Sequence, residues 1–154
     1  MDRTISSREA VPRIRAILQA GGSCPVTVTG TSMVPLLRHG KDQVLISPLN
    51  RPVRRGDILF YVRDNGRCIL HRAVRTGPDG SITVCGDAQT QLEQIRPGQI
   101  LGVVTRVRRK GREFPVTSPV WRAVSDLWML LRPLRPGLLR CAGWLAEKKK
   151  KQSP

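Results

Sequence analysis

The chain of 154 residues is predicted to fold as a small, mainly β domain with a helix before it and helices after it. Valine, isoleucine and leucine occur in short runs separated by glycine, proline, asparagine and aspartate. Several of these runs alternate apolar with polar residues, which is typical of antiparallel strands. Aromatic residues make up 4% of the chain, so aliphatic side chains must form the core. The length suits one compact domain, and no internal repeat divides it.

The apolar runs predict the strands of this domain. They cover residues 26–29, 44–47, 57–63, 68–74, 81–85 and 100–108. The turn sequence Gly77-Pro78-Asp79-Gly80 separates two of them and predicts a hairpin. Alternation places Ile69, His71 and Ala73 on one face of the strand before this turn and Arg72 on the other.

A short helix is expected at the start of the chain. Ser6 and Glu9 have the spacing of a capping box, Pro12 lies near the first turn, and Gly21-Gly22 ends the apolar pattern. Residues 1–22 are therefore expected to form an N-terminal helical segment.

Residues 117–154 predict a second helical segment. Trp and Leu occur with Arg on both sides of the proline-containing stretch 132–136, which favours two short amphipathic helices followed by a basic tail. Packing of these helices on the domain or on a partner is slightly favoured, and binding to a membrane surface is the alternative. Residues 23–116 remain as the β domain.

Three short elements of the β domain contain a nucleophile, a base and an acid. They are Gly-Thr-Ser-Met-Val-Pro at 30–35, Ile-Leu-His-Arg at 69–72 and Cys-Gly-Asp at 85–87. A serine hydroxyl becomes a nucleophile when a base removes its proton. Histidine can do this near neutral pH if a carboxylate orients its ring. Ser32, His71 and Asp87 fit these roles, and the backbone N–H of Ser32 fits one oxyanion donor.

Each of these residues also has an ordinary structural interpretation. Ser32 alone would be a turn residue, His71 a hydrogen-bonded strand residue, and Gly86-Asp87 a common turn. His39 is expected to be exposed and structural, and Met33 to fill apolar space beside the serine. The functional interpretation depends on all the elements occurring together and in order.

The order of the elements resembles the signal peptidase and LexA-like class of serine peptidases, the S26 and S24 groups, from about Val26 to Arg109. In that class Gly-x-Ser-Met-x-Pro is followed by a basic turn, a Gly-Asp-Ile/Val strand, a strand with the base, a Gly-Asp element and a Gly-x-Val strand. The corresponding segments here are 32–35, 38–40, 56–60, 71–72, 86–87 and 101–104. The ordered set is specific, although no single tetrapeptide is.

The resemblance implies an antiparallel β fold and an endopeptidase that cleaves an extended peptide after small residues such as alanine. His71 as the base points to the eukaryotic-type and archaeal-type signal peptidases, because no lysine lies between Lys41 and Lys110. Gly30 stands where several relatives have a hydroxyl residue that supports the oxyanion, a role that Thr31 or a second backbone N–H could take.

The identity of the acid stays open at this point. The acidic element of the histidine branch contains further aspartates after its Gly-Asp pair. Glu93 falls where a later one would lie, so it is the second candidate after Asp87.

The expected location of the enzyme is the cytoplasm, either soluble or peripheral at the inner face of the membrane. Signal peptidases usually have a transmembrane anchor before the serine strand, but no stretch here approaches the ~20 apolar residues required, and no secretory signal is recognisable. The cysteines are then expected to be reduced, and they have no metal-ligand spacing.

The expected partner is a peptide or protein substrate, and the chemistry requires no metal or cofactor. The net charge of +16, from 27 basic and 11 acidic residues, favours contact with polyanions. Sequence-specific nucleic acid binding is not expected, since no helix-turn-helix, zinc spacing or aromatic strand motif is present. Open alternatives are maturation of one dedicated leader-bearing peptide, peptide binding without turnover, and autoproteolysis of the LexA type.

Overall fold

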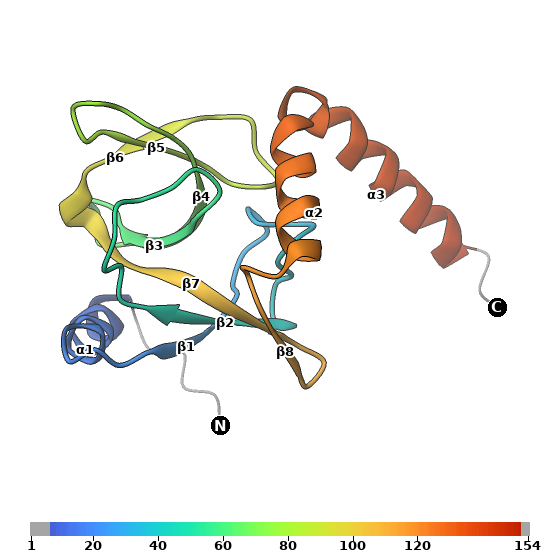
Figure 1. Ribbon diagram of the computed structural model, residues 1–154. Coiled ribbons are helices and arrows are strands. Elements are labelled where there is room, and N and C mark those ends of the chain that lie inside the picture. Colours follow the sequence, from blue (N-terminus) through green and yellow to red (C-terminus); the bar gives the residue numbers. More distant parts are fainter. Residues whose placement is uncertain (1–6, 152–154) are drawn as a thin grey trace.

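The computed structural model describes residues 7–151, with side chains over residues 10–147, and is built around an eight-stranded antiparallel sheet (Figure 1). The elements are α1 (Ser7–Gln19), β1 (Cys24–Thr27), β2 (Asp42–Ser47), β3 (Ile58–Val62), β4 (Cys68–Thr76), β5 (Ile82–Cys85), β6 (Glu93–Ile95), β7 (Ile100–Arg109), β8 (Arg112–Pro115), α2 (Pro119–Leu130) and α3 (Arg135–Lys151). Short 3-10 turns at Pro97–Gln99 and Arg132–Leu134 precede β7 and α3. The predicted mainly β class is confirmed.

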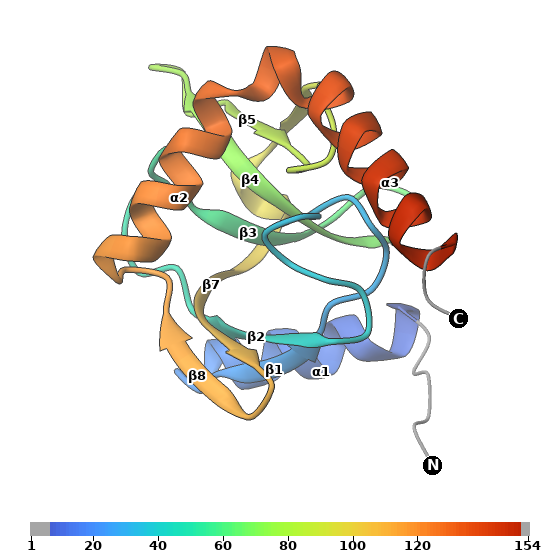
Figure 2. The same ribbon diagram turned by 90° about the vertical axis from the view of Figure 1, so that its right-hand side faces the viewer.

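The strands are arranged in the order β1-β2-β7-β3-β4-β5-β6, and β8 pairs with β7. The long strand β7 pairs with β3 through its first half and with β2 through its second half. Register shifts in three of the pairings bend the sheet strongly. As a result, α1 lies at the end formed by β1 and β2, whereas α2 and α3 lie at the end formed by β4 and β5 (Figure 2).

The predicted hairpin between β4 and β5 is confirmed. Gly77 N donates to Ser81 O at 2.8 Å, and Arg72 of β4 lies opposite Cys85 of β5. The N-terminal helix is present as α1, although Ser6 of the expected capping box lies outside the described residues. Two strands, β6 and β8, were not expected from the sequence.

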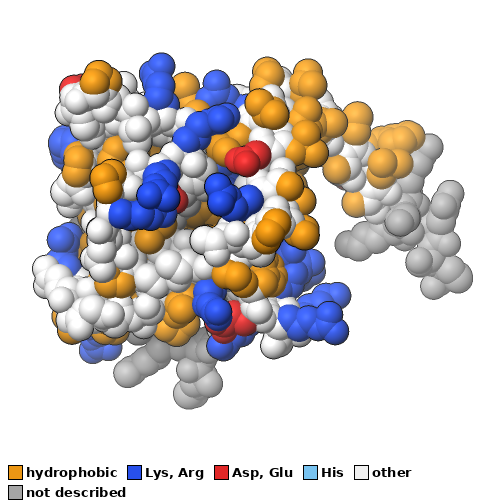
Figure 3. Space-filling model, viewed as in Figure 1, with side chains coloured by type: hydrophobic (Ala, Val, Ile, Leu, Met, Phe, Trp, Pro, Cys, Tyr) orange, Lys and Arg blue, Asp and Glu red, His pale blue; other side chains and the backbone are white. Residues whose placement is uncertain are grey.

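The two predicted C-terminal helices are α2 and α3, with the proline-containing 3-10 turn between them. Trp121, Ser125 and Met129 on one side of α2 are buried against the domain. Apolar side chains on the other side of α2, in the 3-10 turn after it and along α3 are exposed (Figure 3); they include Val120, Val124, Leu127, Leu130, Leu134 and Leu138. Helix α3 projects from the body of the molecule (Figure 1). Within residues 7–151, no helix combines the length and apolar character that crossing a bilayer requires.

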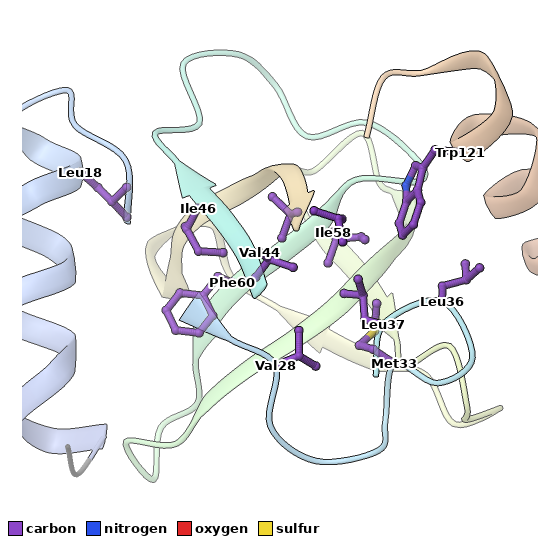
Figure 4. Packing of buried hydrophobic residues seen from close by; sticks show 12 residues of the cluster. Leu18, Val28, Met33, Leu36, Leu37, Val44, Ile46, Ile58, Phe60 and Trp121 are labelled. Carbon is purple, nitrogen blue, oxygen red and sulfur yellow. The ribbon is translucent and has the colours of Figure 1, made fainter. Parts of the chain in front are cut away.

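Strand β3 is buried on both faces and separates two apolar clusters. Ile58 and Phe60 belong to the first cluster, together with Met33 and Leu37 of the β1–β2 loop (Figure 4). Much of the rest comes from Leu18 of α1, Trp121 of α2, Val28 just after β1, and the strand residues Val44, Ile46, Val104 and Val107. Residues Leu59, Tyr61, Ala73, Ile82, Val84, Ile95 and Val103 form the second cluster. Side chains alternate along β4, so His71 and Arg72 lie on opposite faces of the strand, as predicted. They therefore face different clusters.

Candidate functional site

Ser32 lies in the loop between β1 and β2, and the loop is closed by hydrogen bonds at its base. Gly40 N donates to Val28 O at 2.8 Å, and Gly30 N donates to His39 Nδ1 at 2.9 Å. Gly30 has a φ of 77°, a left-handed conformation that favours glycine. His39 is exposed, as expected. The sequence had not indicated its contact with Gly30.

Met33, next to the serine, holds the loop on the domain. Its side chain is 2% exposed and packs in the first apolar cluster, as expected. The carbonyl of Met33 accepts a hydrogen bond from Leu37 N at 2.9 Å, and the carbonyl of Thr31 accepts one from Val34 N at 3.2 Å. In residues 7–151, the backbone N–H groups of Ser32 and Met33 have no protein acceptor. These two donors are therefore available at the serine.

The Ser32 loop contacts the turn after β5 directly. Ala88 N donates to the carbonyl oxygen of Ser32 at 2.8 Å. A Cβ atom at Gly86 would lie 2.7 Å from the same oxygen, so a larger residue at position 86 would push the two segments apart. The structure thus brings together two of the three predicted elements, which are distant in the sequence.

The carboxylate of Asp87 is completely buried and is bound by Arg72. Arg72 Nε donates to Oδ1 at 2.9 Å and Nη2 donates to Oδ2 at 2.7 Å. Its Nη1 donates to Gly56 O at 3.1 Å. Both residues are at most 1% exposed. Asp87 therefore has a charge partner that sequence reasoning did not anticipate, and no hydrogen bond joins it to His71 among the described residues.

The same turn is attached to both C-terminal helices. Trp128 Nε1 of α2 donates to Asp87 O at 2.7 Å. Arg135, the first residue of α3, donates from Nη1 to Gly86 O at 3.1 Å and to Gln89 O at 3.0 Å. The turn formed by residues 86–89 thus connects the serine loop, β4, α2 and α3.

His71 lies on β4 and is 4% exposed. Its Nδ1 atom is 3.2 Å from Tyr61 Oη and 3.8 Å from Glu93 Oε2. The Tyr61 hydroxyl donates its only hydrogen to Glu93 Oε2 at 2.8 Å, so in its contact with His71 it must act as the acceptor. The ring therefore bears its proton on Nδ1, which leaves the lone pair on Nε2.

Glu93 is fixed by Arg63. Arg63 donates to it from Nε at 2.8 Å and from Nη2 at 2.6 Å. These hydrogen bonds lower the pKa of Glu93. Burial, and then the neighbouring Glu93, raise the pKa of Tyr61. At neutral pH the carboxylate is therefore ionised and the phenol keeps its proton, as the hydrogen-bond directions require.

Burial lowers the pKa of His71. The charge of Glu93 opposes this shift, Arg63 adds to it, and Asp87 opposes it. Desolvation disfavours the imidazolium, so His71 is neutral at neutral pH. A neutral ring with its lone pair on Nε2 is the form that a general base requires.

Tyr61 and Arg63 were missed as site residues by the sequence analysis. Tyr61 is the only tyrosine of the chain. It belongs to the second apolar cluster and lies on the same face of β3 as Leu59, which lies opposite His71. Alternation along β3 could have placed it near His71. The contact with Glu93 depends on β6, whose three residues are too few for a periodic signal.

The Ser32 hydroxyl makes no hydrogen bond to His71 in the part of the chain that the structure describes. Catalytic hydrogen bonds are often long before a substrate binds. The structure shows His71 held by Tyr61 and the Ser32 loop attached to the turn after β5, without a direct contact between the two side chains among the described residues.

Comparison of the chain with models of known protein families gives no match, and no curated protein matches it.

Asp87→Asn is expected to lower the free energy of unfolding by about 3 kcal/mol or more, because it leaves the buried Arg72 guanidinium without its counter-charge. Urea unfolding monitored by circular dichroism at pH 7 measures this loss. Asp64→Asn is the matched control, since Asp64 pairs with Arg96 at 2.7 Å with both side chains more than 70% exposed. The control should lose far less. Equal losses would contradict the structural role of Asp87.

Proposed function

We propose that this protein is a serine endopeptidase of the signal peptidase-like class, with Ser32 as nucleophile and His71 as general base. The observation that carries the proposal is the burial, charge and tautomer of the His71 ring. The ring is buried and neutral, and its Nδ1–H is directed to Tyr61, so that Nε2 can accept a proton. The contacts among Tyr61, Glu93 and Arg63 support the tautomer that a general base requires.

The proposed reaction begins when a substrate brings its scissile carbonyl to Ser32. The hydroxyl oxygen attacks the carbonyl carbon while His71 Nε2 takes the hydroxyl proton. The backbone N–H groups of Ser32 and Met33 would donate to the developing oxyanion. His71 then gives the proton to the leaving amine, which breaks the peptide bond. Water, activated by the same ring, hydrolyses the acyl-enzyme and restores the serine.

The acid of this mechanism is Glu93 rather than Asp87. Glu93 Oε2 lies 3.8 Å from His71 Nδ1 and would stabilise the imidazolium that forms during attack. Tyr61 stands between the two groups and fixes the ring orientation. Asp87 supports the site indirectly, because its ion pair with Arg72 holds the turn that contacts the serine loop.

The proposed substrate is an extended peptide with small residues next to the scissile bond. An apolar cavity of about 410 Å³ lies between Pro35 and Leu36 of the serine loop and Val120 and Val124 of α2. Apolar side chains of a peptide bound at Ser32 would fit there. A dedicated leader-bearing peptide fits this description.

The test is covalent labelling of Ser32 by a penem and by a fluorophosphonate, located by mass spectrometry. Ser32→Ala should abolish labelling, and His71→Ala should slow it by about 10²-fold or more, the usual contribution of a general base. Asp64→Ala, which changes an exposed side chain outside the serine loop, is the control and should label at the wild-type rate. Labelling of Ser32 that is unaffected by His71→Ala would contradict the mechanism. An unlabelled Ser32 would favour a peptide-binding module without turnover.

We also propose that α2 and α3 attach the protein to an anionic membrane surface. Leu130 is 68% exposed and Leu127 57%, and such an apolar face fits the interfacial region of a bilayer. The net charge of +16 adds attraction to anionic lipid.

Cosedimentation with vesicles tests this attachment. Vesicles containing phosphatidylglycerol should bind the protein, and pure phosphatidylcholine vesicles should bind it far less. The double variant Leu127→Gln/Leu130→Gln should lose roughly tenfold or more in binding, since two apolar side chains leave the lipid. Leu92→Gln, which changes an apolar residue 45% exposed outside the helices, should bind as the wild type does. An equal loss in the two variants would count against attachment through α2.

A further inference from the structure

We propose that a second site, in the cavity between the sheet and α2, binds a small phosphorylated ligand. The cavity has a volume of about 540 Å³ and is lined by the segment before β3, by β7 and by α2. Basic side chains gather on the face of the molecule where these elements meet (Figure 3). This inference does not depend on the proposed peptidase activity.

The cavity has an excess of positive charge. Six arginines and two aspartates line it. Three of the arginines have carboxylate partners: Arg51 pairs with Asp57, Arg72 with Asp87, and Arg106 with Glu113.

The other three arginines are Arg54, Arg55 and Arg122. Among the described residues, their guanidinium groups have no carboxylate within ion-pair distance. Asp126 is the one remaining carboxylate in the lining. An anion entering the cavity would therefore meet a surplus of guanidinium charge.

Ser125 gives a second, independent indication of a ligand. This α2 residue is 4% exposed and lines the cavity. Its Oγ atom has no hydrogen-bond partner among the described residues. A buried hydroxyl without a partner is unfavourable, and an oxygen atom of a bound ligand would remove this cost.

The charge and shape together favour a phosphoryl group attached to an apolar portion. A phosphoryl group has close to two negative charges and three strong acceptor oxygens, which match several guanidinium donors better than a single carboxylate does. Ile58, Val103, Val104 and Trp121 supply apolar wall. The volume fits a ligand of ordinary small-molecule size.

Isothermal titration calorimetry with phenyl phosphate, at constant ionic strength, tests the site in the wild-type protein. Phenyl phosphate should bind at one site per chain, and more tightly than inorganic phosphate or benzoate. Benzoate binding as tightly as phenyl phosphate would overturn the phosphoryl assignment. Absence of saturable binding would overturn the site itself.

Three variants locate the binding. Arg122→Gln and Ser125→Ala should each weaken phenyl phosphate binding by about tenfold or more, the usual effect of losing one hydrogen bond to a charged group. Ser125→Ala should keep or raise the melting temperature, because the Oγ atom has no partner to lose and the cost of burying it is removed. Arg67→Gln, at an exposed arginine away from the cavity, is the charge-matched control. If it weakened binding as much as Arg122→Gln, binding would be nonspecific and the proposal would be overturned.

Discussion

The ion pair between Arg72 and Asp87 determines how the parts of the candidate site are held together. Both groups are removed from water, and two parallel hydrogen bonds join them. A buried pair of this kind contributes little net stability compared with apolar residues, but losing one partner is costly. Its main effect here is geometric, since it fixes the turn at residues 86–89 against β4. The serine loop, α2 and α3 then attach to that turn through Ala88, Trp128 and Arg135.

His71, the residue next to Arg72 on β4, is buried without a charge. His71 and Arg72 are adjacent in the chain, yet one is buried as a neutral ring and the other as a paired cation. Alternation along the strand makes this possible, because each side chain faces a different apolar cluster. The carboxylates follow the same division: Asp87 compensates Arg72 on one side of β4, and Glu93, held by Arg63, lies by His71 on the other. The strand therefore joins a structural ion pair to a proposed catalytic base.

Much of this arrangement could be predicted from local sequence. The six apolar runs became strands, the turn at 77–80 became a hairpin, and the face of His71 followed from alternation. Other features depend on contacts between distant segments. Arg72 could be placed opposite the face of His71, but its pairing with Asp87 requires the register of β4 and β5. The short strand β6 has no periodic pattern of its own, so the approach of Glu93 to Tyr61 could not be read from the sequence.

The proposed mechanism depends most on the protonation state of His71, and ¹⁵N NMR of the labelled imidazole measures this state directly. The structure predicts a neutral ring protonated on Nδ1, with a pKa below the usual value of about 6.5. Glu93→Gln should lower this pKa further, because it removes the charge that favours the imidazolium; the exposed His39 serves as the internal control. As the pH falls from about 6.5 toward the lowered pKa, the unfolded chain binds more protons and His71's contribution to stability is lost. A ring protonated on Nε2, or a pKa that rises in Glu93→Gln, would contradict the assignment of His71 as the base.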